Sequence, residues 1–100
     1  MLKHIVMFKL KENALGADRA ENLQRVKLGL EALKDKIGEI KFFEVGVNMI
    51  NSGAAYDMAL LSEFESQAAL LAYQNHPEHL LVAKLVQEVC ESRIVVDYLS

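Results

Sequence analysis

The chain has 100 residues, of which 52% are hydrophobic, and its 11 basic and 14 acidic residues give a formal net charge of −3. This length predicts one domain over residues 1–100, and the interspersed charges, without a Lys/Arg cluster, exclude the usual nucleic-acid-binding surfaces. No apolar run reaches the length of a membrane span, and Lys3 and Lys9 fall where a signal peptide would be apolar. We therefore expect a cytoplasmic protein with neither a nucleic-acid nor a membrane partner.

The apolar content is high for so small a domain, which buries roughly two-thirds of the surface of its unfolded chain. Surplus apolar surface usually ends in a subunit interface, so we expect a homodimer. The single cysteine, Cys90, has no partner for an internal disulfide and is expected to be a small buried filler.

Apolar periodicity predicts seven elements in chain order. They are a strand over residues 3–11, a helix opened by Gly16 and Asp18 and stopped by Gly38, strands over 40–47 and 57–64, a helix from Ser66 to Asn75, a helix from Pro77 to about Glu91, and a strand over 93–99. Gly29 inside the first helix costs roughly 1 kcal/mol relative to alanine and indicates close packing.

The order β-α-β-β-α-α-β predicts an α+β fold, with a four-stranded antiparallel sheet that carries its helices on one face. The first strand is apolar on both sides, with His4, Val6 and Phe8 on one face and Ile5 and Met7 on the other. The apolar face without helices is therefore expected to be buried against another surface, and the same sheet of a second chain is the simplest such surface.

The stretch from Tyr73 to His79 joins the last two helices. Pro77 pushes His76 into an extended conformation and suits the first position of the next helix. His79 then lies in the first turn of that helix, while His76 is expected to be exposed. These residues form either a chemical site or a plain helix–helix corner with polar residues at its tip.

Five segments together resemble the stress-responsive dimeric α/β-barrel (Dabb) family across essentially the whole chain. They are His4-Ile-Val-Met-Phe-Lys, Phe43-Glu-Val-Gly, Tyr56-Asp-Met-Ala-Leu, Tyr73-x-x-His-Pro-x-His and Val95-Val-Asp-Tyr. The resemblance implies a ferredoxin-like fold whose sheets pair face to face in a dimer to form a barrel.

The family includes plant polyketide cyclases, and the resemblance implies a pocket between sheet and helices. Their working residues look like His4, Tyr73, His79 and Asp97 here: a histidine base, a tyrosine that holds the carbonyl and an aspartate that orients the histidine. The expected pocket lining is Val6, Phe8, Met58 and Leu30. Met58 and Leu30 stand where the cyclases have a histidine and an aromatic residue, which implies a more apolar pocket.

Asp97 lies late in the last strand, where a carboxylate is costly to bury unless it is paired. We expect its partner to be the N–H of His79, which would fix the tautomer of that ring. The alternative is that the pair only ties the third helix to the last strand. His76 and His79 have no accompanying acidic or cysteine ligand set, so we expect no metal and no cofactor.

Three functional hypotheses remain open. The first is a protein that binds a small apolar carbonyl compound, with cyclase- or isomerase-like proton transfer. The second is a non-catalytic dimer of stress response whose pocket is filled by side chains. The third is a monooxygenase, because related dimeric barrels include cofactor-free and haem-degrading monooxygenases.

Overall fold

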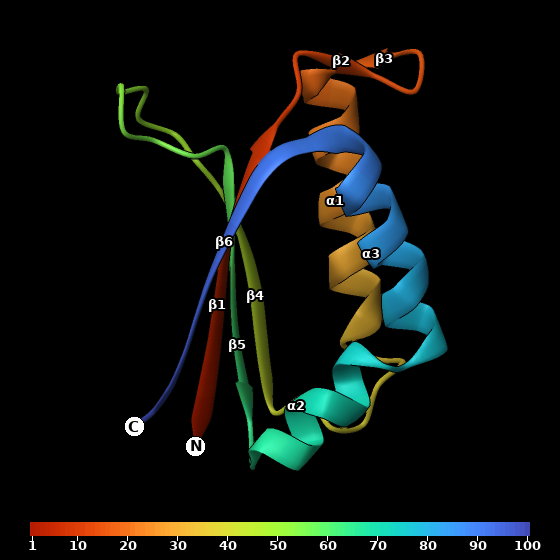
Figure 1. The fold of residues 1–100 in the computed structure, drawn as a ribbon, viewed down its shortest axis with the longest axis vertical. Helices are drawn as coiled ribbons and strands as arrows, with labels where there is room; N and C mark the ends of the chain where they lie inside the picture. The colour runs from red at the N-terminus through yellow and green to blue at the C-terminus, as the bar shows by residue number, and fades with distance from the viewer.

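The computed structural model describes residues 1–100, and Figure 1 shows two helices packed on one face of a sheet. The sheet consists of β1 (Leu2–Leu10), β4 (Phe42–Val47), β5 (Met58–Phe64) and β6 (Cys90–Leu99). The helices are α1 (Arg19–Leu33), α2 (Gln67–Gln74) and α3 (Pro77–Val89). The predicted order of these seven elements and the one-sided sheet are confirmed.

β1 lies inside the sheet, whose strand order is β4-β5-β1-β6 with every neighbouring pair antiparallel. Because side chains alternate along a strand, Val6, Phe8 and Leu10 all point toward the helices and are buried. They belong to a core cluster of 16 buried residues, to which α1 contributes Val26, Leu30 and Leu33. The sheet therefore has one face in the core and one face outside it.

A short hairpin between β1 and α1 was not predicted. It pairs β2 (Asn13–Ala14) with β3 (Ala17–Asp18) through a turn in which Leu15 and Gly16 both have positive φ. Buried Asn22 of α1 fixes the hairpin by donating its side-chain N–H to the carbonyl of Ala14 at 2.9 Å. Asp18 caps the helix by accepting from the N–H of Glu21.

Two predicted boundaries are wrong. The first helix ends at Leu33 rather than near Gly38, although Ile37 remains buried in the core after the helix has ended. The last strand begins at Cys90, directly after α3, rather than at Arg93. The early start of β6 follows from its pairing with β1, because the register between the two strands shifts: Lys9 pairs with Ser92 and Leu10 pairs with Cys90. Glu91 is the extra residue of this β-bulge.

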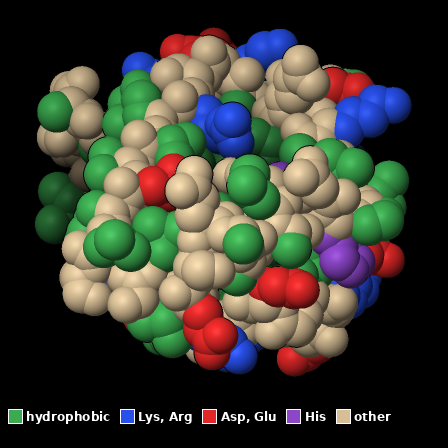
Figure 2. All heavy atoms as spheres, turned by 60° about the horizontal axis from the view of Figure 1, so that its bottom comes forward, with side chains coloured by type: hydrophobic (Ala, Val, Ile, Leu, Met, Phe, Trp, Pro, Cys, Tyr) green, Lys and Arg blue, Asp and Glu red, His purple; other side chains and the backbone are tan.

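The face of the sheet away from the helices is apolar and uncovered. Met7 on β1 is 42% exposed and Val96 on β6 is 59% exposed. Ile5, Leu61 and Ile94 lie on the same face, as their strand registers show. Figure 2, in which the bottom of Figure 1 comes forward, shows hydrophobic side chains in separate patches among polar and charged groups.

The two chain ends lie side by side at one end of the sheet (Figure 1), where the backbone N–H of Ser100 donates to the carbonyl of Met1 at 3.1 Å. No helix of the structure is long and apolar enough to cross a membrane.

Gly29 packs α1 against α3, as the sequence indicated. A methyl group at this position would lie 3.4 Å from a methyl of Val82, which is an ordinary van der Waals contact. We therefore expect Gly29→Ala to raise the free energy of unfolding by about 0.5–1 kcal/mol through helix propensity. Urea denaturation measures this change. Gly29→Leu is the control, because its larger side chain cannot fit against Val82 and should destabilise the protein.

Candidate functional site

His4 and Asp97 form a hydrogen-bonded pair beneath the helices. They are direct cross-strand partners on β1 and β6, and His4 Nδ1 lies 2.5 Å from Asp97 Oδ1. The His4 side chain is 6% exposed and that of Asp97 is 37% exposed, so the carboxylate keeps contact with water while the ring does not. Because an ionised carboxylate only accepts, His4 Nδ1 carries the proton that it shares with Asp97.

The predicted pairing of Asp97 with His79 is wrong. The antiparallel register places Asp97 directly beside His4, which takes the carboxylate. His79 instead forms a hydrogen bond with the carbonyl oxygen of Gln74, which lies 2.9 Å from His79 Nδ1 at the corner between α2 and α3. A carbonyl also only accepts, so His79 likewise carries its proton on Nδ1 and leaves Nε2 free.

Tyr73 lies between the two histidines in the last turn of α2. Its ring centroid is 4.5 Å from that of His79 and 6.4 Å from that of His4. The side chain is fully buried, and its hydroxyl has no hydrogen-bond partner. Burial raises the pKa of the phenol well above its ordinary value of 10, so Tyr73 stays protonated and can donate.

The corner that positions Tyr73 and His79 follows from local sequence. Ser66 caps α2 by accepting from the N–H of Ala69, and His76 is extended before Pro77, as predicted. His76 is half-buried rather than exposed, because its Nδ1 accepts the backbone N–H of Glu78 and caps α3. This capping role gives His76 a structural function that its position before a proline did not suggest.

His4, Tyr73 and His79 line one cavity of about 30 Å³ between the sheet and α3. This volume holds one or two water molecules. The lining residues are His4, Val6, Phe8, Leu30, Leu60, Tyr73, His79, Val82, Ala83, Val86 and Arg93. The sequence-predicted residues are thus brought together except for two: Met58 is buried but lies outside the cavity, and Asp97 reaches it only through His4.

Arg93 lines the cavity although the sequence suggested only a solvated charge. Its place on β6 opposite Phe8 puts it on the face of Val95 and Asp97, which turns toward the helices. The signal in the sequence was this alternation, since residues 93, 95 and 97 share one face of a strand.

Electrostatics keep the His79 ring neutral. Burial lowers its pKa below the ordinary value of 6.5, and the positive charge of Arg93 acts in the same direction. The hydrogen bond to the carbonyl of Gln74 raises this pKa, by less than burial lowers it. The site therefore offers the free acceptor nitrogen of neutral His79, the ring of His4 held by Asp97 and one phenol donor in mainly apolar surroundings, a set suited to acid–base chemistry.

We expect the ring of His79 to titrate with a midpoint below 6.5 in NMR spectra, and Asp97→Asn to leave that midpoint unchanged because the carboxylate bonds His4. A pKa that is lower in the folded state also makes protonation of His79 destabilising as the pH falls below about 6.5. His79→Gln should remove this part of the pH dependence of stability. A clear shift of the His79 midpoint in Asp97→Asn would show that the two groups interact after all.

Comparisons with known proteins bear on the family and the fold of this chain. Residues 2–100 match the family model of the stress responsive A/B barrel domain. An uncharacterised protein of Streptomyces coelicolor is 32% identical over 98 residues, which cover 98% of each chain. A dimeric protein of unknown function with a ferredoxin-like fold from Bacteroides fragilis has a TM-score of 0.82 and 41% identity, covering 97% of this chain and 93% of that one.

A hydroxynitrile lyase from Passiflora edulis has a TM-score of 0.80 at 22% identity, covering 97% of this chain and 90% of that one, a likeness that shows the fold alone. The predicted ferredoxin-like α+β fold is confirmed by these structures. The match over almost every residue also confirms the resemblance seen in the sequence: this chain belongs to the stress responsive A/B barrel domain (Dabb) family.

Proposed function

We propose that this protein binds a small carbonyl compound between the sheet and α3 and transfers a proton on it. The observation that carries the proposal is the hydroxyl of Tyr73, which is buried without a hydrogen-bond partner. Burying a polar group without a partner costs about 1–3 kcal/mol. The unpaired hydroxyl of Tyr73 therefore suggests a ligand that accepts a hydrogen bond from it. A carbonyl oxygen is such an acceptor.

In this proposal His4 is the general base. Its Nδ1–H is held by Asp97 at 2.5 Å, an arrangement that orients the ring and stabilises the imidazolium formed when Nε2 takes a proton. The proton comes from a carbon next to the carbonyl, and the electron pair moves onto the carbonyl oxygen. Tyr73 donates to that oxygen, a contribution worth several kcal/mol in a dry site. We assign the base role to His4 rather than to His79 because the carboxylate of Asp97 bonds His4.

Neutral His79 completes the site as a second acceptor in contact with the Tyr73 ring. The hydroxynitrile lyase with the same fold supports the proposal, because its name describes chemistry at a carbon that bears a hydroxyl group. The polyketide cyclases that the sequence resembles support it as well.

We also propose a cytoplasmic location, since the single cysteine of the chain is unpaired.

The size of the cavity favours the second hypothesis, a non-catalytic dimer. Its volume of about 30 Å³ is far below the roughly 300–1,000 Å³ of most small-molecule sites, so side chains fill most of the space. A ligand must therefore displace side chains at the edge of the cavity. The haem-binding alternative gains no support, because a porphyrin is far larger than this space.

We further propose that two chains pair through the open faces of their sheets. The exposed Met7, Ile94 and Val96 form an apolar surface there, and the Bacteroides fragilis relative is described as dimeric. An obligate interface of this kind should bury on the order of 2,000 Å² or more in total.

Met7→Glu tests the dimer by placing a charge at the centre of the open face. We expect the wild type to sediment as a dimer at micromolar concentration and Met7→Glu to sediment as a monomer, because an unpaired charge cannot be buried in an apolar interface. Leu28→Glu is the matched control, since Leu28 is exposed on α1 and lies outside this face. A monomeric wild type would overturn the proposed pairing.

Tyr73→Phe tests the site. Because the hydroxyl has no partner, we expect this substitution to raise the free energy of unfolding by about 1 kcal/mol while it weakens the binding of ketones followed by NMR. Tyr56→Phe is the matched control, since its hydroxyl lies 3.0 Å from Ser92 Oγ and its loss should destabilise the protein. If Tyr73→Phe destabilises the protein like the control and leaves ketone binding intact, the hydroxyl serves the fold rather than a ligand.

A further inference from the structure

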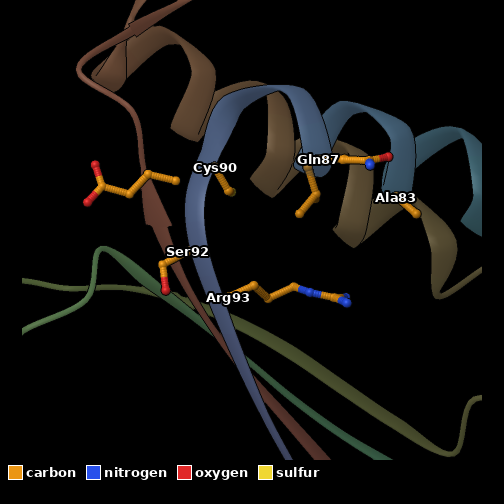
Figure 3. A pocket seen from close by; sticks show the side chains of 7 residues that line it. Ala83, Gln87, Cys90, Ser92 and Arg93 are labelled. Carbon is orange, nitrogen blue, oxygen red and sulfur yellow. The ribbon is translucent and has the colours of Figure 1, made fainter.

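A groove of about 390 Å³ lies next to the cavity, where α3 passes into β6 (Figure 3). It is lined by Ala83, Val86, Gln87, Cys90, Glu91, Ser92 and Arg93. Three of these residues, Ala83, Val86 and Arg93, also line the cavity, so the two spaces share a wall. The groove has the volume of a small-molecule site, which the cavity alone lacks.

The β-bulge at Glu91 shapes this groove. Cys90 pairs with Leu10 and Arg93 pairs with Phe8, and both partners face the helices. Residues three apart in a regular strand would lie on opposite faces, so only the extra residue lets both side chains face α3. Figure 3 shows the Arg93 side chain extending from β6 beneath Ala83 and Gln87.

The guanidinium of Arg93 is free to bind. All five ion pairs of the chain use other residues, and the one acidic residue of the groove, Glu91, has its carboxylate 3.9 Å from Lys9 Nζ. The charge of Arg93 also acts inside the cavity, because it opposes protonation of His79 and favours ionisation of Tyr73. An exposed side chain without a partner can rotate to admit a ligand and break no bond.

We propose that the substrate is a small keto acid, whose carboxylate is bound by Arg93 in the groove while its carbonyl reaches Tyr73 in the cavity. A guanidinium binds a carboxylate through two parallel hydrogen bonds, which fixes both the position and the orientation of the ligand. Ala83 and Val86, which lie in the wall shared by the groove and the cavity, suit the short carbon chain between the two groups. This inference rests on the proposed function, since it names the substrate class of the same site.

The test compares levulinate, a ketone with a carboxylate, with its uncharged methyl ester, by calorimetry and by NMR. We expect wild-type protein to bind levulinate at least about tenfold more tightly than the ester. Arg93→Gln should bind the two equally, and Arg93→Lys should keep only part of the preference because it lacks the planar fork. Lys41→Gln is the charge-matched control, since Lys41 precedes β4 at the opposite edge of the sheet and should leave the preference intact.

The outcomes separate the inference from the function on which it rests. Equal binding of acid and ester by the wild type, or an unchanged preference in Arg93→Gln, overturns the keto-acid assignment and leaves ketone binding in place. Butyrate, a carboxylate without a ketone, should bind in an Arg93-dependent way and leave the signals of Tyr73 unshifted. Butyrate binding without any shift of Tyr73 by levulinate or its ester would overturn the carbonyl site itself.

Discussion

The alternation of side chains along β1 is the constraint on which the rest of the structure depends. β1 lies between β5 and β6, so both of its edges are hydrogen-bonded and its register with both neighbours is fixed. A slip by one residue would move His4, Val6 and Phe8 out of the core and bring Ile5 and Met7 into it. The helix-covered core, the hydrogen-bonded pair of His4 with Asp97 and the uncovered face all follow from this one register.

The residues of the candidate site come from two places, the sheet and the corner between α2 and α3. The sheet holds His4 and Asp97, whose distance is set by backbone pairing rather than by flexible loops. The corner between α2 and α3 holds Tyr73 and His79 through the carbonyl of Gln74 and the break at Pro77. Groups supported by regular elements keep their geometry without help from a ligand, which is the condition for preorganised chemistry.

Much of the fold could be predicted because its signals are local. The apolar period of each element and the effect of Pro77 on its neighbour need no knowledge of distant residues. The β2–β3 hairpin was missed because each of its strands has two residues, too few for any period. The early start of β6 was missed because the bulge at Glu91 depends on pairing with β1, which lies about 80 residues away.

Most residues of the candidate site could be predicted from the sequence, but their hydrogen-bond partners could not. His4, Tyr73 and His79 were brought together by a resemblance that covers the whole chain. The partner of Asp97 depended on which strand lies beside β6, and a sequence pattern does not give strand order. The alternation with Val95 and Asp97 already places Arg93 on the helix-covered face, whereas the orientation of Cys90 depends on the register shift between β1 and β6. Pairing between distant strands is thus the information that single-sequence reasoning lacked.

The position of the chain ends has a mechanical consequence. β1 begins and β6 ends at the same corner, where Met1 and Ser100 are hydrogen-bonded. Force applied between these two ends would load the antiparallel ladder one pair at a time, like a zipper, rather than all pairs at once. The pair of His4 with Asp97 is the third strand pair from that corner, after those of Leu2 and Lys3. Tension would therefore separate His4 from Asp97 while most of the core is still folded.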